Sequence, residues 1–255
     1  MNENEFKKQN RTTAIVLAAG SGKRMHSDVA KQFIELLGKP IICYCLDTFE
    51  KSDYIDEIIL VTNTDGLDVC KDITEKYGYK KVSAIVLGGK ERYHSVWSGL
   101  QAAKYEADST NENPPKYIFI HDGARPFVDE GILKRNAEAL QNGRACVTGM
   151  PSKDTVKIAG EDGFVCDTPK RSNVWIIQTP QSFDFSVIYE SYRKLIETEA
   201  EVLAKGIQVT DDAMVVEHFG EEPVRLVEGT YENIKITTPE DLDIAEILLK
   251  KGNRI

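Results

Sequence analysis

The sequence TAIVLAAGSGKRM, residues 13–25, decides the fold of this chain. Its first part, residues 13–18, is a short apolar run, which predicts a β-strand buried on both faces. Its second part contains Gly20 and Gly22 beside basic residues. Glycine lets a backbone approach an anion closely, and successive backbone N–H groups can cradle phosphates. The stretch therefore predicts a buried strand that leads into a phosphate-binding loop.

Similar apolar runs recur at residues 57–62, 82–87 and 116–121. Helical patterns alternate with them, beginning after Pro40 and continuing, for example, over residues 67–77. Strands this apolar, alternating with helices, predict a parallel sheet covered on both faces. The expected fold class is therefore α/β, with a doubly wound, mostly parallel, Rossmann-like sheet.

The alternation breaks after Met150. Residues 154–158 and 163–168 flank the sequence Glu161-Asp162-Gly163, and Asp-Gly between two such runs is a strong hairpin signal. We expect a projecting β-hairpin arm over about residues 151–173. Its apolar side chains would need a partner surface, which predicts a homodimer. These side chains are Val156, Ile158, Phe164 and Val165.

The remaining sequence predicts a helix from Asp184, strands over residues 224–229 and 233–237, and a last helix. The start of this helix is predicted by Thr238-Pro239-Glu240-Asp241, which offers a capping hydroxyl, a proline in the first turn and acidic residues near the positive end of the helix dipole. We expect residues 1–12 to form a disordered lead-in and residues 13–255 to form one domain.

Composition narrows the class of protein. The chain has 255 residues, of which 41% are hydrophobic and 29% charged, and its net charge of −9 argues against broad nucleic-acid binding. No run approaches the roughly 18 apolar residues of a membrane span, and residues 1–12 lack the apolar core of a signal peptide. The five cysteines lack paired spacing, which favours reduced thiols. We therefore expect a cytoplasmic protein without nucleic-acid or membrane partners.

Two common phosphate loops do not fit the glycine loop. A Walker A loop needs glycine at the position of Leu17 and Ser or Thr at the position of Arg24. The dinucleotide-binding fingerprint needs a small residue at the position of Met25. The loop does carry cations, at Lys23, Arg24 and Lys31, which favours an anion such as a nucleoside triphosphate over a solvated charged loop.

Further motifs follow the loop in a fixed order. They are Lys31-Gln32-Phe33, Gly88-Gly89-Lys90-Glu91-Arg92 with Ser95-Val96, His121-Asp122-Gly123-Ala124-Arg125-Pro126, Lys153-Asp154-Thr155-Val156-Lys157, Gln178-Thr179-Pro180-Gln181, Thr210-Asp211-Asp212-Ala213 and Asn233-Ile234-Lys235-Ile236-Thr237. Together with the glycine loop they resemble the sugar-phosphate nucleotidyltransferases and, within them, the family of 2-C-methyl-D-erythritol 4-phosphate cytidylyltransferases. Each motif is weak alone, but their order over residues 13 to 243 is specific.

The resemblance implies a reaction. These enzymes transfer CMP from CTP to 2-C-methyl-D-erythritol 4-phosphate and release pyrophosphate, in non-mevalonate isoprenoid precursor synthesis. A phosphate monoester has a second pKa of about 6, so the nucleophile is already an anion and needs no general base. Positive charge is needed to bring two anions together and to stabilise the transition state. The sequence agrees, since it is rich in lysine and arginine and shows no Ser-His-Asp or Cys-His set.

The resemblance also implies residue roles. Arg24 and Lys31 would stabilise charge on the α-phosphate, while Arg171 and Lys235 would hold the acceptor phosphate and aim it. The implied nucleotide-binding residues are Ala18, Ala19, Gly20, Ser21, Gly22, Lys23, Gly89, Arg92, Ser95 and Asp122. The implied acceptor-binding residues are Arg125, Thr155, Arg171, Thr179 and Lys235.

Asp122 directly follows the apolar run 116–121, so it lies at the carboxyl end of a predicted strand, where ligands of such sheets bind. A carboxylate there can hold Mg²⁺ or another divalent cation that bridges phosphate oxygens. The expected partners are CTP and a small polyol phosphate. Thr155 and Arg171 lie on or just after the predicted arm, so a homodimer would share its active sites.

Other functions remain open at this point. The ribitol 5-phosphate cytidylyltransferases share the fold, CTP and most motifs, although the residues around Asp154 are closer to the methylerythritol family. Gly123 departs mildly from that family, in which alanine is commoner at this position. A sugar-nucleotide enzyme using UTP or GTP would leave the later motifs as coincidence. A non-catalytic nucleotide sensor is disfavoured because Arg24, Lys31, Asp122 and Lys235 are all present. An NAD-binding oxidoreductase remains the alternative on the same fold.

Overall fold

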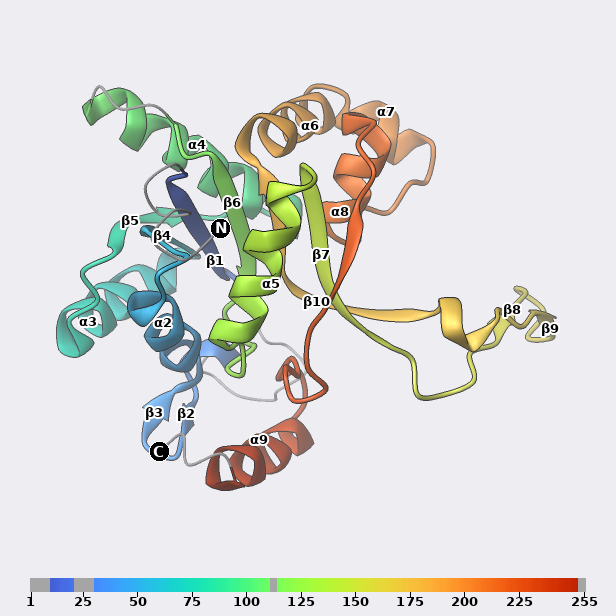
Figure 1. Ribbon diagram of the computed structural model, residues 1–255, viewed down its shortest axis with the longest axis horizontal. Coiled ribbons are helices and arrows are strands. Elements are labelled where there is room, and N and C mark those ends of the chain that lie inside the picture. The colour runs from blue at the N-terminus through green and yellow to red at the C-terminus, as the bar shows by residue number, and fades with distance from the viewer. Residues whose placement is uncertain (1–9, 21–29, 111–113, 252–255) are drawn as a thin grey trace.

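The computed structural model describes residues 10–20, 30–110 and 114–251. Among these residues, seven strands form one sheet in the order β11-β7-β10-β6-β1-β4-β5 (Figure 1). The strands are β1 (Thr12–Ala18), β4 (Glu57–Thr62), β5 (Val82–Leu87), β6 (Tyr117–Asp122), β7 (Ala145–Pro151), β10 (Trp175–Asp184) and β11 (Arg225–Glu228). β1 runs parallel to β4 and β6, whereas β10 runs antiparallel to its neighbours β6 and β7. The predicted doubly wound, mostly parallel sheet is confirmed.

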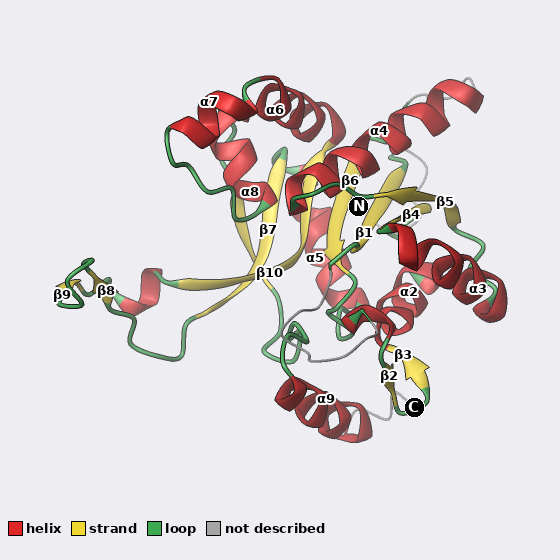
Figure 2. Ribbon diagram, turned by 180° about the vertical axis from the view of Figure 1, so that it is seen from behind, coloured by secondary structure: helices red, strands yellow, loops and turns green. Residues whose placement is uncertain are grey.

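Helices cover both faces of this sheet (Figure 2). One face packs against α2 (Ile41–Lys51), α3 (Leu67–Tyr77) and α5 (Glu130–Gln141), and the other packs against α4 (Arg92–Thr110) and α6 (Phe185–Glu197). Side chains of β1 alternate between the two cores, because successive residues of a strand point to opposite faces. Ala14 and Val16 belong to the first core and Ile15 to the second. No helix in the described part of the chain is long and apolar enough to cross a membrane.

Strands β7 and β10 have no counterpart among the predicted elements. Pro180 argues against a central strand, because proline cannot donate to a neighbouring strand. The sheet tolerates it because the pairing of β10 with β7 shifts register between Ile177 and Gln181. Polar side chains of β10 also find buried partners, as when the Ser182 hydroxyl donates to Asn136 Oδ1 at 3.0 Å.

The strand predicted over residues 233–237 is wrong. This segment is an irregular loop that joins none of the described sheets. The Ile236 N–H donates to the Ala124 carbonyl at 2.9 Å, and the buried Asn233 side chain donates to the Thr179 carbonyl at 2.9 Å. Lys235 is thereby held beside the loop that follows β6.

The predicted last helix is confirmed as α9 (Pro239–Lys251), which packs on the hairpin of β2 (Glu35–Leu36) and β3 (Lys39–Pro40). Ile236 joins this small apolar core with Leu36 and Leu249. The remaining elements are η2 (Lys31–Phe33), η3 (Thr64–Gly66), η4 (Arg171–Asn173), α7 (Glu199–Ala204), α8 (Asp212–Val215) and η5 (Val216–Gly220).

The predicted hairpin is confirmed and stands away from the sheet (Figure 1). Its strands β8 (Ile158–Ala159) and β9 (Val165–Asp167) pair antiparallel, and Gly163 makes the turn at a φ of +80°. Phe164 is 76% exposed and Val165 58% exposed, whereas Val156 is half-buried. We call residues 151–173 the arm.

At the amino-terminal end, β1 begins at Thr12, and Asn10 and Thr12 are buried. Residues 10–12 therefore belong to the folded domain and not to a disordered lead-in, whereas residues 1–9 of the predicted lead-in lie outside the described part.

Asp241 caps α9 and thereby holds the loop that carries Lys235. Its carboxylate accepts from the backbone N–H groups of Thr237 at 2.8 Å and Thr238 at 2.9 Å. Burial opposes its ionisation, but these hydrogen bonds outweigh burial and lower the pKa of Asp241. We expect Asp241→Ala to lower the free energy of unfolding by about 1–2 kcal/mol in urea titrations at pH 7. The exposed Asp243→Ala is the control, and an equal loss in both variants would contradict this role.

Candidate active site

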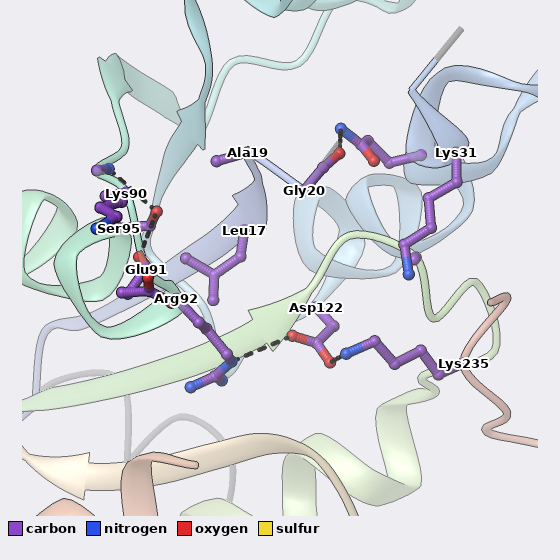
Figure 3. A pocket seen from close by; sticks show the side chains of 13 residues that line it. Leu17, Ala19, Gly20, Lys31, Lys90, Glu91, Arg92, Ser95, Asp122 and Lys235 are labelled. Atoms are coloured by element: carbon purple, nitrogen blue, oxygen red, sulfur yellow. Dashed lines mark hydrogen bonds and ion pairs between the residues drawn. The ribbon is translucent and has the colours of Figure 1, made fainter. Parts of the chain in front are cut away.

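The carboxyl ends of β1 and β6 lie side by side, with Leu17 paired to Asp122. From β1 the sheet continues to β4 on one side and to β6 on the other, so this is the switch point where ligands of doubly wound sheets bind. A cavity of about 390 Å³ opens there (Figure 3). Its lining residues are Leu17, Ala19, Gly20, Lys31, Gln32, Gly89, Lys90, Glu91, Arg92, Ser95, Asp122, Ala124 and Lys235. We call it the nucleotide cavity.

The glycine loop forms one wall of the nucleotide cavity. Ala18 ends β1 and is buried, and Ala19 and Gly20 line the cavity. The buried Gln32 side chain donates to the Ala18 carbonyl and, at 3.4 Å, to the Gly20 carbonyl, so it fixes the start of the loop. The motif Lys31-Gln32-Phe33 did not predict this role for Gln32. Ser21, Gly22, Lys23 and Arg24 lie outside the described residues, so their roles stay predictions.

The opposite wall is the turn between β5 and α4. The Gly89 N–H donates to the hydroxyl of the buried Ser95 at 3.2 Å. A Cβ at Gly88 would lie 2.5 Å from that hydroxyl oxygen, and a Cβ at Gly89 would lie 2.3 Å from the Cβ of His94. Both glycines are therefore needed for the turn to pass this close to α4.

Asp122 lies between basic side chains. Its carboxylate is 2.8 Å from Lys235 Nζ, 3.7 Å from Arg92 Nε and 3.8 Å from Arg125 Nε. Figure 3 shows Arg92 and Lys235 reaching it from opposite sides. Burial opposes ionisation, but the three cations outweigh it and hold the pKa of Asp122 well below its ordinary value. Asp122 is therefore an anion at neutral pH.

His121 and Thr179 support Asp122 from behind. His121 Nε2 donates to the Arg125 carbonyl at 3.1 Å, so Nδ1 carries no proton and accepts from the Thr179 hydroxyl at 3.1 Å. The Thr179 oxygen in turn accepts from the Asp122 N–H at 3.1 Å. Burial is the main cause that lowers the pKa of His121 to about 4, so it is neutral at pH 7. His121 is thus a buried, hydrogen-bonded residue behind Asp122 and acts as no proton donor to the cavity.

A second cavity of about 410 Å³ adjoins the first, and Lys235 lines both. We call it the acceptor cavity. The Arg125 side chain on its wall donates to the Asn233 carbonyl at 2.8 Å, and Ser152 to Asp154 lie at the base of the arm. Thr155 and Arg171 are exposed on the arm and line neither cavity, and the buried Thr179 lies behind Asp122 rather than on a cavity wall.

Within the described residues, no group of three or more His, Cys, Asp and Glu side chains is arranged to hold a metal ion. Asp122 is an ionised carboxylate on the cavity wall, and its contact with Arg92 is long at 3.7 Å. One carboxylate with phosphate oxygens and waters is a common set of ligands for Mg²⁺. The residues present therefore fit a divalent cation that arrives with a phosphate ligand.

A doubly wound sheet with a cationic cavity at its switch point, joined through one lysine to a second cavity, defines a nucleotide-binding enzyme of phosphorylated substrates. The family model for 2-C-methyl-D-erythritol 4-phosphate cytidylyltransferase (IspD) matches residues 12–251. The chain therefore belongs to the 2-C-methyl-D-erythritol 4-phosphate cytidylyltransferase family, and it is an enzyme.

Individual relatives agree with this assignment. The chain is 46% identical to the 2-C-methyl-D-erythritol 4-phosphate cytidylyltransferase of Lachnospira eligens, over 93% of this chain and 99% of the relative. It is 44% identical to that of Clostridium botulinum, over 94% and 98%. The crystal structure of 4-diphosphocytidyl-2C-methyl-D-erythritol synthase from Anaerococcus prevotii superposes with a TM-score of 0.79 at 38% identity, over 94% of this chain and 99% of that one.

The low pKa of His121 predicts an acid-sensitive fold. The ordinary histidine pKa of 6.5 applies to the unfolded chain, so stability is fully present above about pH 6.5 and is lost as the pH falls toward about 4. We expect the wild type to lose about 2 kcal/mol more unfolding free energy between pH 7 and pH 5 than His121→Gln. Urea titrations at both pH values measure this difference. The exposed His218→Gln should behave as wild type, and a His121→Gln variant with the wild-type pH dependence would refute the assignment.

Proposed function

We propose that this cytidylyltransferase binds CTP in the nucleotide cavity and 2-C-methyl-D-erythritol 4-phosphate in the acceptor cavity, and transfers CMP where the two meet. The observation that carries this proposal is Lys235, which lines both cavities and contacts Asp122 at 2.8 Å. A cation at this junction brings the acceptor phosphate to the α-phosphorus of CTP, and such positioning supplies a large part of a rate enhancement.

The acceptor phosphate attacks as an anion, so the residues supply charge and orientation. Lys31, with Arg24 from the glycine loop, stabilises the charge that develops on the α-phosphate. Lys235 and Arg171 grip the acceptor phosphate, and Arg125 and Thr155 complete its site. Thr179 acts through the backbone of Asp122, to which its hydroxyl is bonded.

The nucleotide is held mainly by backbone. Ala18 to Gly22 cradle the triphosphate, with Lys23 beside them, and Gly89 and Ser95 meet the base and ribose. This proposal is supported by Ala19, Gly20 and Gly89 on the cavity lining, because residues this small let a ligand approach the backbone closely.

Asp122 is proposed to hold Mg²⁺ or another divalent cation. A bound cation of this kind neutralises charge on the triphosphate and favours departure of pyrophosphate. Lys235 contacts the same carboxylate at 2.8 Å, so Asp122 would hold the cation at the point where Lys235 would hold the acceptor phosphate.

The arm is proposed to pair this chain with a second copy as a homodimer. The exposed Phe164 and Val165 support this, because an apolar projection this open is normally covered. Thr155 and Arg171 lie on the arm and away from both cavities of their own chain, so the partner's cavity is where they would act.

We also propose that the enzyme works in the cytoplasm without a nucleic-acid or membrane partner. The net charge of −9 and the free state of the five cysteines support this.

The reaction is tested by pyrophosphate release from CTP and Mg²⁺ with 2-C-methyl-D-erythritol 4-phosphate or ribitol 5-phosphate as acceptor. We expect release with the first acceptor alone. In Lys235→Met, kcat/KM for the acceptor should fall roughly 10²–10³-fold, by analogy with loss of one preorganised donor. Lys134→Met, an exposed lysine on α5, is the matched control. Release with ribitol 5-phosphate alone, or full activity in Lys235→Met, would contradict the proposal.

The shared site is tested by Phe164→Asp, which places a charge on the exposed apolar tip of the arm. We expect the dimer to dissociate in sedimentation velocity and activity to fall with it, because a charge is costly in an apolar interface. Leu203→Asp, at an exposed apolar residue on α7, is the control and should leave both unchanged. A fully active wild-type monomer would defeat the proposal.

A further inference from the structure

Asp212, in the motif Thr210-Asp211-Asp212-Ala213, has no role in the scheme above. It is the first residue of α8 and is fully buried. Its carboxylate accepts two parallel hydrogen bonds from Arg92, from Nη1 at 2.7 Å and from Nη2 at 2.6 Å. The hydroxyl of the buried Tyr192 donates to the same carboxylate. A buried carboxylate needs a cationic partner in good geometry and further hydrogen bonds, and Asp212 has both, although the Arg92 side chain is 30% exposed.

The turn that carries Asp212 is itself fixed to the sheet. Gln181 on β10 is buried, and its side-chain Oε1 accepts from the backbone N–H groups of Asp212 at 3.0 Å and Ala213 at 2.8 Å. The Gln181 amide donates to Asp211 at 3.0 Å. Asp212 therefore has little freedom to move, and its two hydrogen bonds to Arg92 restrict the Arg92 side chain as well.

This pairing decides which edge of Arg92 faces the nucleotide cavity. Both Nη atoms are directed to Asp212, and Nε faces the Asp122 carboxylate at 3.7 Å. If the Nη atoms were released, the guanidinium could turn both of them onto Asp122 and form a close pair there. Asp212 thus keeps the cation of Arg92 on the cavity wall and keeps it at a distance from Asp122.

We propose that Asp212 is a positioning residue for the CTP site, acting through Arg92. The inference rests on the proposed function, because it takes the first cavity as the place where CTP binds. Asp212 touches no substrate itself. It sets the orientation of a charged group that lines the cavity, and it leaves Asp122 open to a phosphate-bound cation.

The test is steady-state kinetics of Asp212→Asn with each substrate varied in turn. Asparagine keeps the size of the side chain but sets an N–H group against one N–H of Arg92. We expect KM for CTP to rise about tenfold or more, while KM for the acceptor stays within about threefold. Arg92→Gln should show the same pattern, and the double variant should be no worse than Arg92→Gln, because coupled residues are not additive.

Arg92→Lys separates positioning from charge, and it serves if Asp212→Asn fails to fold. Lysine keeps the charge but cannot make two parallel hydrogen bonds. We expect it to raise KM for CTP as well. Glu222→Gln removes the partner of Arg144 in a surface ion pair at 2.8 Å and should leave both KM values unchanged.

A purely structural role would give a different result. Lower thermal stability of Asp212→Asn with an unchanged KM for CTP, or equal rises in both KM values, would overturn the proposal, as would an Arg92→Lys variant with wild-type KM. Wild-type enzyme that releases no pyrophosphate from CTP and 2-C-methyl-D-erythritol 4-phosphate would instead overturn the proposed function. Calorimetric CTP affinity of the same variants would then decide the role of Asp212 alone.

Discussion

The arrangement of the site depends on one carboxylate, Asp122, and the cations around it. A site for two phosphate substrates needs concentrated positive charge, and such charge repels itself when no substrate is bound. Asp122 lies within 4 Å of Arg92, Arg125 and Lys235, which come from three separate parts of the chain. The low pKa of Asp122 follows from this arrangement, because the three cations outweigh burial and favour the ionised carboxylate.

The fold serves to deliver these groups to one place. β6 ends at Asp122 next to the end of β1, and the glycine loop leaves from the latter. The loop with Lys235 is fixed by Asn233 and by the cap at Asp241, and Arg92 is fixed by Asp212. The segments that carry Lys235 and Arg92 are thus held in place by hydrogen bonds to the sheet or to a helix end. The side chains need little reordering when substrate binds, which is the condition for electrostatic stabilisation of a transition state.

The sequence predicted the parts of this arrangement that are local. The buried strand before the glycine loop, the position of Asp122 at a strand end, the arm and the start of α9 at Pro239 follow from short patterns, and the structure has each of them. Strand β10 was not predicted, because Pro180 and its polar neighbours are typical of a loop. In the structure, a register shift accommodates the proline, and polar side chains of β10 bond to buried partners such as Asn136. Residues 233–237 look like a strand by composition, but the Ile236 N–H is bonded to the loop after β6 instead of to a strand. The pair of Arg92 and Asp212 joins residues 120 positions apart, so no local pattern contains it.

We propose Asp122 as the place where the cationic wall and the bound nucleotide meet. Calorimetric affinity for CTP, measured with and without Mg²⁺ in the wild type and in Asp122→Asn, tests it most directly. We expect Mg²⁺ to strengthen CTP binding in the wild type and to lose that effect in Asp122→Asn. An equal effect of Mg²⁺ in both proteins would contradict the claim, because the cation would then bind without the carboxylate.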